Sequence, residues 1–245
     1  MRVGLFGRGR LGSAILACAR RQEGLEIAWS VDQGETPAGP VDAAIDASVA
    51  GAVESHLTWA LDTSTPFVIG TTGWEIPDLA TRVGDRIGVL TASNFSLTVA
   101  LLARLATVAG RYAQLDPARD AYVFEHHHRL KADAPSGTAK TLAAAVMKGC
   151  PRKTEWLMPP PEGALKPHQL SVGVLRAGTE FGFHTVGIDT PSETLELSHR
   201  ARSREPFAEG ALTAARWLQG RKGLFTMEDL AASILNPLFD FGVNP

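Results

Sequence analysis

The first 95 residues alternate short apolar runs with segments in which apolar residues recur at helical spacing. The apolar runs predict strands over residues 2–6, 25–31, 41–46, 66–69 and 86–90. The segments of helical spacing predict helices over residues 13–21, 49–61 and 76–83. Strands that alternate with helices pair in parallel through right-handed crossovers. The pattern therefore predicts a doubly wound α/β domain of the Rossmann type.

The pattern changes beyond residue 96, where strands begin to follow one another directly. Helices are predicted over 97–111 and 136–148, a strand over 121–125, and further strands over 168–175, 180–189 and 193–201. Residues 151–167 hold five prolines and predict a loop. An amphipathic helix is predicted over 207–219, and Thr226 is expected to cap a last helix. These elements indicate an inserted α+β domain with an open mixed or antiparallel sheet.

Composition and charge restrict the classes of function. An apolar fraction of 44% and a charged fraction of 20% over 245 residues are typical of a globular protein of two domains. The net charge of -2 argues against a nucleic acid or a membrane surface as partner. Cys18 and Cys150 have neither metal-ligand spacing nor a disulfide pattern. With no export signal and no membrane-spanning run, a cytoplasmic protein is expected.

The chain begins with a pattern typical of dinucleotide binding. Gly7-x-Gly9-x-x-Gly12 follows a predicted strand and opens a predicted helix, which allows a tight turn and close approach of a pyrophosphate. Asp32, at the end of the second strand, is placed to accept hydrogen bonds from a ribose diol and to repel a 2'-phosphate. NADH is therefore favoured. Arg8 and Arg10 in the turn leave NADPH open as an alternative.

Two further loops leave the same predicted edge of the sheet. Gly70-Thr71-Thr72-Gly73 follows the fourth strand, and Ala92-Ser93-Asn94-Phe95 follows the fifth. Ligands of doubly wound sheets bind outside the carboxyl ends of the strands. Both loops are therefore expected to flank the nicotinamide.

The segment from residue 125 to 140 holds the candidate chemistry. His126, His127, His128 and Lys131 lie beside Pro135-Ser136-Gly137-Thr138, which predicts a capped helix start that can bind a carboxylate. This combination suits a small dicarboxylate substrate. Hydride addition to a C=N or C=C bond also needs a proton donor, for which Lys131 and His127 are the candidates. Adjacent histidines alternate in direction along a strand and lack further ligands, so no metal is expected.

The same segment carries a family resemblance. Glu125-x-His127-His128-x-x-Lys131-x-Asp133-x-Pro135-Ser136-Gly137-Thr138-Ala139 resembles the signature of 4-hydroxy-tetrahydrodipicolinate reductase, also called dihydrodipicolinate reductase. The likeness continues in order over nearly the whole chain, through residues 7–12, 68–73, 94–96, 176–178 and 199–211.

The resemblance implies an enzyme that reduces 4-hydroxy-tetrahydrodipicolinate to tetrahydrodipicolinate with NADH or NADPH, in lysine and diaminopimelate biosynthesis. It implies that His127 and Lys131 are catalytic and that His128, Ser136, Gly137 and Thr138 bind the substrate. The implied cofactor residues are Gly7, Arg8, Gly9, Arg10, Leu11, Gly12, Asp32, Gly70, Thr71, Thr72, Ala92, Ser93, Asn94 and Phe95.

The resemblance also implies a domain division and an assembly. Residues 1–95 and 204–245 are expected to form the dinucleotide-binding domain, and residues 96–203 the domain for substrate binding and oligomerisation. A homotetramer that pairs the second sheets would explain apolar residues on both faces of the strands over 168–201, among them Val172, Phe183 and Val186.

Three residues depart from the family's usual pattern, and two other functions remain open. Phe183 stands where glutamate is common, while His126 and Leu97 stand where small residues are common. An aspartate-type amino-acid dehydrogenase shares the nucleotide fold but does not require the His-His-x-x-Lys loop. The other alternative is a catalytically silent regulator that binds NAD(P)H.

Overall fold

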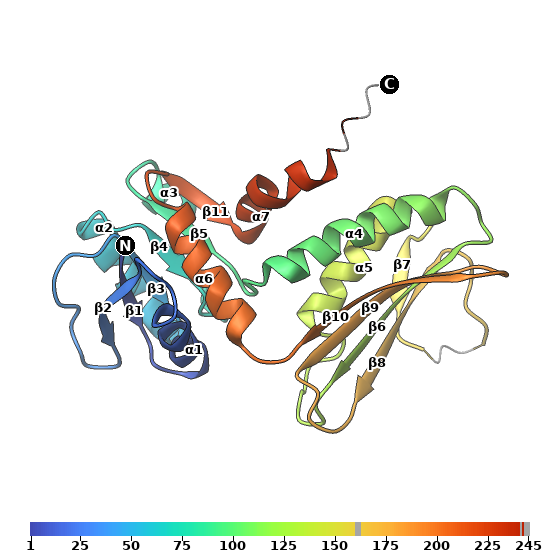
Figure 1. The fold of residues 1–245 in the computed structure, drawn as a ribbon, viewed down its shortest axis with the longest axis horizontal. Coiled ribbons are helices and arrows are strands. Elements are labelled where there is room, and N and C mark those ends of the chain that lie inside the picture. The colour runs from blue at the N-terminus through green and yellow to red at the C-terminus, as the bar shows by residue number, and fades with distance from the viewer. Residues whose placement is uncertain (160–162, 241, 243–245) are drawn as a thin grey trace. The chain divides into compact units, whose positions relative to one another are not determined.

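The computed structural model describes residues 1–159, 163–240 and 242. The chain divides into two compact units. The first combines residues 1–97 with 204–245, and the second comprises residues 98–203. Each unit has a sheet and a hydrophobic core of its own (Figure 1).

Within the described residues, the first unit is built on a six-stranded sheet in the order β11-β5-β4-β3-β1-β2. Every paired neighbour in it runs parallel. This confirms the predicted Rossmann-type fold. The strands are β1 (Arg2–Phe6), β2 (Glu26–Val31), β3 (Ala43–Asp46), β4 (Phe67–Ile69), β5 (Gly88–Thr91) and β11 (Gly223–Thr226).

Helices cover both faces of this sheet. One core cluster joins strand residues to Ile15 of α1 and Leu212 of α6, and the other joins them to Leu57 of α2 and Val83 of α3. The α6 helix packs against α1. It also lies close to the loop after β5, because a Cβ on Gly210 would lie 1.9 Å from the carbonyl oxygen of Phe95. The helices are α1 (Arg10–Ala19), α2 (Val53–Asp62), preceded by a 3-10 turn η1 (Ala50–Ala52), α3 (Leu79–Val83) and α6 (Glu205–Trp217).

The C-terminal segment completes the first unit with elements that the hydropathy pattern only partly predicted. β11 was not predicted, and it extends the sheet by pairing with β5. The predicted cap is confirmed, because Thr226 and Asp229 form a capping box at the start of α7 (Met227–Leu235). A short 3-10 helix, η2 (Asn236–Phe239), follows.

The second unit holds a mixed sheet, with five strands in the described chain, in the order β10-β9-β6-β8-β7. β8 pairs in parallel with β6 and β7, whereas β9 pairs antiparallel with β6 and β10. The loop predicted over 151–167 is wrong in part, because it contains β7, and its residues 160–162 lie outside the described residues. The strands are β6 (Asp120–His127), β7 (Glu155–Leu157), β8 (Gln169–Arg176), β9 (Gly182–Asp189) and β10 (Thr194–Ala201).

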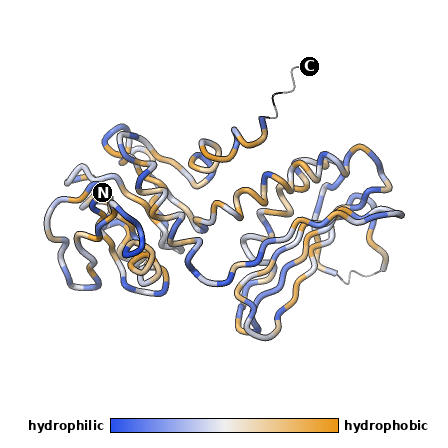
Figure 2. The backbone as a smooth tube through the Cα atoms, in the orientation of Figure 1, coloured by the Kyte–Doolittle hydropathy of each residue, from blue (hydrophilic) through white to orange (hydrophobic). Residues whose placement is uncertain are grey.

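One face of this sheet is covered by α4 (Leu97–Gln114) and α5 (Gly137–Gly149) (Figure 1). The two helices cross closely, since a Cβ on Gly110 would lie 2.4 Å from the carbonyl oxygen of Val146. Orange and blue bands alternate along the strands in Figure 2, as expected for a sheet with two different faces.

The other face of the second sheet carries a shallow recess. Phe183 lies edge-on to Phe124 there, and the guanidinium of Arg200 lies over the Phe183 ring. His126 also lies half-buried on this side of β6. Two of the departures from the family pattern, Phe183 and His126, thus lie on the face opposite the helices. The recess is lined by Tyr122, Phe124, Ser171, Gly173, Phe183, Thr185 and Glu196.

Across the part of the chain that the structure describes, no helix has the length and apolar character to cross a membrane.

Candidate active site

The cofactor residues predicted from the sequence all lie at one edge of the first sheet. They follow β1, β2, β4 and β5, and the carboxyl ends of parallel strands meet at the same edge. β1 has β2 on one side and β3 on the other, so the order of strands reverses beside β1. Ligands of open α/β sheets bind at such a reversal.

The turn after β1 has the shape that a dinucleotide needs. Gly7 has a φ of 90°, and a Cβ on Gly12 would lie 2.0 Å from the carbonyl oxygen of Gly7. A Cβ on Gly9 meets no described atom within 4 Å, so the outer side of the turn is open. Among its described residues, α1 has neither a side-chain cap nor an acid in its first turn. Its positive end therefore faces an open glycine turn, which fits a pyrophosphate.

A second carboxylate lies beside Asp32. Glu35 Oε2 accepts a hydrogen bond from the backbone N–H of Asp32 at 2.8 Å, and the guanidinium of Arg8 forms an ion pair with the Glu35 carboxylate. A backbone hydrogen bond from Asp32 and the contact with Arg8 hold the pKa of Glu35 below its usual value. Sequence reasoning missed Glu35, although an acid three residues after Asp32 is visible in the sequence.

The loop that contains Thr71 is held by a buried carboxylate at the end of β3. Asp46 is fully buried and accepts hydrogen bonds from the hydroxyls of Thr71 and Ser48, and it lies 2.6 Å from His56 Nδ1. Burial raises the pKa of Asp46, but these hydrogen bonds outweigh it and the net shift is downward. Sequence reasoning missed both Asp46 and His56. An acid ending an apolar strand was the available signal.

In the second unit, alternation along β6 separates the three adjacent histidines. Glu125 and His127 are buried on the face that the helices cover. His126 points to the opposite face, where its Nε2 lies 3.0 Å from the carbonyl oxygen of Ala177. His128 follows the strand and is half-buried. His127 is therefore in a different environment from its two neighbours.

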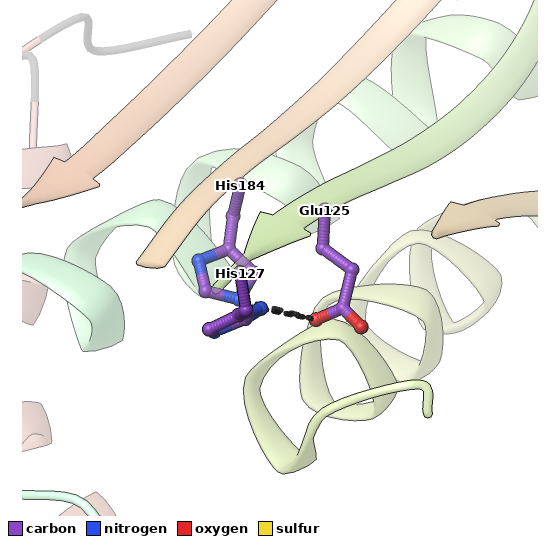
Figure 3. Close-up of side chains that lie close together, drawn as sticks. All are labelled: Glu125, His127 and His184. Atoms are coloured by element: carbon purple, nitrogen blue, oxygen red, sulfur yellow. Dashed lines mark ion pairs between the residues drawn. The ribbon is translucent and has the colours of Figure 1, made fainter. Parts of the chain in front are cut away.

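Glu125, His127 and His184 of β9 converge in the close-up of Figure 3. Glu125 Oε1 accepts hydrogen bonds from the backbone N–H of Ser136 at 2.9 Å and from Arg176 Nη2 at 2.7 Å. Glu125 Oε2 lies 3.4 Å from His127 Nδ1 and 3.6 Å from His184 Nε2. Burial raises the pKa of Glu125, but the nearby His184 imidazole and hydrogen bonds from Ser136 and Arg176 outweigh it and hold this pKa well below its usual range.

Burial raises the pKa of Glu125 but lowers the pKa of His127. It lowers the pKa of the imidazole to about 4, with Glu125 opposing the shift and nearby positive charge, including that of Lys131, adding to it. His127 is therefore neutral at pH 7 and can accept a proton.

This pKa predicts a pH dependence of stability. The unfolded chain protonates His127 below about pH 6.5 and the folded chain only below about 4, so the unfolded state binds more protons in between. The free energy of unfolding should therefore fall as pH decreases from 6.5 to 4. Urea unfolding at several pH values measures this slope. His127→Gln should reduce it and leave a remainder from His199, whose pKa burial also lowers. An unchanged slope would contradict the prediction.

Lys131 and the start of α5 lie in the loop that follows β6. Lys131 Nζ donates to Asp133 Oδ1 at 2.7 Å, and this hydrogen bond lowers the pKa of Asp133. The predicted cap of α5 is confirmed, because Ser136 Oγ accepts a hydrogen bond from the backbone N–H of Ala139. Gly137, the first residue of the helix, is exposed. An ammonium group and a helix N-terminus thus lie in one loop.

The same cluster contains three potential metal ligands. Donor atoms of Glu125, His127 and His184 lie within 4.8 Å of one another. The guanidinium of Arg176, however, already contacts the Glu125 carboxylate. A divalent ion would add positive charge beside a fixed cation. The residues present therefore fit an acid–base cluster better than a metal centre.

Sequence reasoning assigned no role to Glu125, Arg176 or His184. Glu125 could have been found, because residues two apart on a strand share a face and Glu125 precedes His127 by two. Arg176 and His184 reach the cluster through the strand register, in which Arg176 pairs with His127 and His184 with Glu125.

Comparisons with known proteins agree over both units. The family model for the N-terminus of dihydrodipicolinate reductase matches residues 1–95, and the model for its C-terminus matches residues 98–231. The chain is 42% identical over 199 residues to the 4-hydroxy-tetrahydrodipicolinate reductase of Rhodopseudomonas palustris (strain TIE-1), covering 77% of this chain and 72% of the relative. With the enzyme of the same name from Zymomonas mobilis it is 36% identical over 248 residues, covering 94% and 96%.

A solved structure supports the fold. The dipicolinate-bound dihydrodipicolinate reductase from Paenisporosarcina sp. TG-14 superposes with a TM-score of 0.76 at 22% sequence identity. The alignment covers 94% of this chain and 99% of that one.

Proposed function

This chain belongs to the dihydrodipicolinate reductase family, and we propose that His127 and Lys131 handle the proton in its reduction of 4-hydroxy-tetrahydrodipicolinate. The family places it among the oxidoreductases of lysine and diaminopimelate biosynthesis that use a pyridine nucleotide. The observation that carries the proposal is the neutral, buried His127 in the same loop region as a charged Lys131 and the capped start of α5.

The two side chains have complementary tasks. The conversion releases the 4-hydroxyl group as water and consumes one hydride and one proton. A pyridine nucleotide supplies the hydride when bound. Lys131 is the proton donor, because its ammonium group, which is paired with the Asp133 carboxylate in the free protein, carries a proton that it can give to the substrate. His127, neutral at pH 7, accepts a proton and passes it on.

Ser136, Gly137, Thr138 and His128 are proposed to hold the substrate carboxylates. The first turn of α5 presents backbone N–H groups at the positive end of a helix of 13 residues. Gly137 leaves this turn open, since a Cβ built there meets no described atom within 4 Å. The related Paenisporosarcina enzyme binds dipicolinate, a planar dicarboxylate of this kind.

Binding of pyridine-2,6-dicarboxylate tests this part of the proposal. Calorimetric titration should show binding to the wild type, and Thr138→Val should weaken it by about tenfold, the value of one hydrogen bond to a charged group. Thr141→Val is the matched control, because Thr141 is exposed one turn further along α5. Equal affinity in wild type and Thr138→Val would contradict the proposed cradle.

The two domains are proposed to divide the work. Residues 1–95 and 204–245 would bind the dinucleotide, and residues 96–203 would bind the substrate and pair in a homotetramer. Support for the assembly comes from the open face of the second sheet, where the recess beside Phe183 lies and where the side chain of Leu175 is exposed.

The cofactor is proposed to be NADH, with NADPH as a weaker substitute. The loop from Gly7 to Gly12, Asp32, the Gly70 to Thr72 loop and the Ala92 to Phe95 loop are proposed to contact it. Glu35 adds to the repulsion of a 2'-phosphate by Asp32, because it places a second carboxylate at the end of β2 and neutralises Arg8.

Glu35→Gln should therefore shift the enzyme toward NADPH. The substitution removes a negative charge near the ribose and frees the guanidinium of Arg8. We expect kcat/KM for NADPH relative to NADH to rise by up to about fivefold, the worth of an exposed charge pair. Steady-state kinetics with both cofactors measure the ratio. Glu23→Gln, an exposed change in the same unit, is the control, and an unchanged ratio in Glu35→Gln would rule out this role for Glu35.

A further inference from the structure

We infer that Glu125 is a positioning residue, which fixes His127 in the tautomer with its proton on Nδ1 and leaves Nε2 as the acceptor for the transferred proton. The inference rests on the proposed role of His127 and extends it to a residue that does not itself touch the substrate.

The Glu125 carboxylate is held in one orientation. Its Oε1 atom accepts hydrogen bonds from the backbone N–H of Ser136 and from Arg176 Nη2. Arg176 is itself fixed, because the same Nη2 atom donates to the carbonyl oxygen of Asp133 at 2.7 Å. These contacts occupy one carboxylate oxygen and direct the other, Oε2, toward the imidazoles of His127 and His184.

Within the described chain, Oε2 of Glu125 and Nδ1 of His127 are both buried without a hydrogen-bond partner. They lie 3.4 Å apart, whereas a typical N–H···O distance is about 2.9 Å, so a movement of the imidazole that shortens and straightens this contact joins them. An ionised carboxylate can only accept a hydrogen bond. Nδ1 must then be the nitrogen that carries the proton, because a second acceptor facing Oε2 would leave both atoms unsatisfied.

The opposite nitrogen of His127 lies against a glycine. A Cβ on Gly182 would be 3.2 Å from His127 Nε2, so glycine leaves the space of a methyl group beside this atom. The Nδ1–H tautomer places a lone pair on Nε2, the nitrogen beside Gly182. The imidazole is thereby prepared to accept a proton at Nε2.

His184 connects this arrangement to the start of α5. Its Nε2 atom lies 3.2 Å from Ser136 Oγ, the atom that caps the helix. Its ring meets the His127 ring edge-on at 5.1 Å between centroids, which restricts rotation of the His127 side chain. His184 thus links His127 to the helix turn that is proposed to hold the carboxylate.

Nitrogen-15 NMR of histidine-labelled wild type tests the tautomer directly, with His127→Gln used to assign the signals. At pH 7 we expect His127 to be protonated on Nδ1. Glu125→Gln keeps an oxygen acceptor for Ser136 and Arg176 but places an NH2 donor opposite Nδ1. It should therefore move the proton to Nε2. A wild-type His127 protonated on Nε2 would overturn the inference, even if the variant did not fold.

Kinetics distinguish positioning from a purely structural role. Glu125→Gln should lower kcat by roughly tenfold to a hundredfold, part of the 10²–10⁴ that general acid–base catalysis contributes, with KM for both substrates within about twofold. Glu193→Gln, an exposed change in the same unit, is the matched control. A variant that folds, shows the moved proton and keeps wild-type kcat would overturn the inference. Absence of any turnover by the wild type would instead refute the proposed function, and the NMR result would still report the tautomer.

Discussion

Replacing His127 and Lys131 together with alanine should abolish turnover while NADH still binds with an affinity within about twofold of wild type. General acid–base groups contribute roughly 10²–10⁴-fold to a rate. Both residues lie in the second unit, whereas the glycine turn and Asp32 lie in the first. We therefore expect a loss of about 10⁴-fold in kcat/KM for the double variant, measured as NADH oxidation, with NADH affinity measured by fluorescence titration.

The single variants and surface controls sharpen this prediction. Residues that act as a unit are not additive, so His127→Ala or Lys131→Ala alone should lose most of the activity that the double variant loses. Lys148→Ala and His168→Ala change the same residue types elsewhere in the second unit and should leave turnover unchanged. Near-normal turnover by the double variant would refute the assignment of the proton chemistry.

Gly12→Ala should disrupt the cofactor turn itself. An added Cβ would lie 2.0 Å from the carbonyl oxygen of Gly7, so the turn must open before a methyl group fits. Backbone atoms cannot move aside as a flexible side chain can. We expect NADH affinity to fall at least a hundredfold and the protein to lose roughly 1–3 kcal/mol of stability, as for overpacking of a dense site. Calorimetric titration and urea unfolding measure the two effects.

Gly9→Ala separates the two effects. A Cβ at Gly9 meets no described atom within 4 Å, and this residue has an ordinary φ of -65°. Its methyl group would instead lie on the open side of the turn, where the pyrophosphate is proposed to approach. We expect weaker NADH binding with unchanged stability. If Gly9→Ala bound NADH normally, the pyrophosphate would have to lie elsewhere.

Local patterns were sufficient to predict most of the first unit. Each of its longer strands is a mainly apolar run, and the glycine spacing and Asp32 follow the ends of such runs. β7 and β11 were missed because each is short and only partly buried, whereas the equally short β3 and β4 are fully buried.

The loop that follows β6 was predicted, but the buried cluster beside it was not. His127, Lys131 and Ser136 are close in the sequence, so spacing alone places them in one loop. Arg176 lies 51 residues from Glu125 and reaches it only because β8 pairs in parallel with β6. His184 arrives through the antiparallel pairing of β9. Strand register is set by packing over the whole sheet, which no local pattern encodes.

The most direct test is NADH oxidation by the purified chain, with substrate generated by the aldol condensation that precedes this reduction in lysine biosynthesis. The proposed function predicts oxidation of NADH only while the condensation supplies 4-hydroxy-tetrahydrodipicolinate, with tetrahydrodipicolinate as the product. Failure to oxidise either NADH or NADPH under these conditions would contradict it.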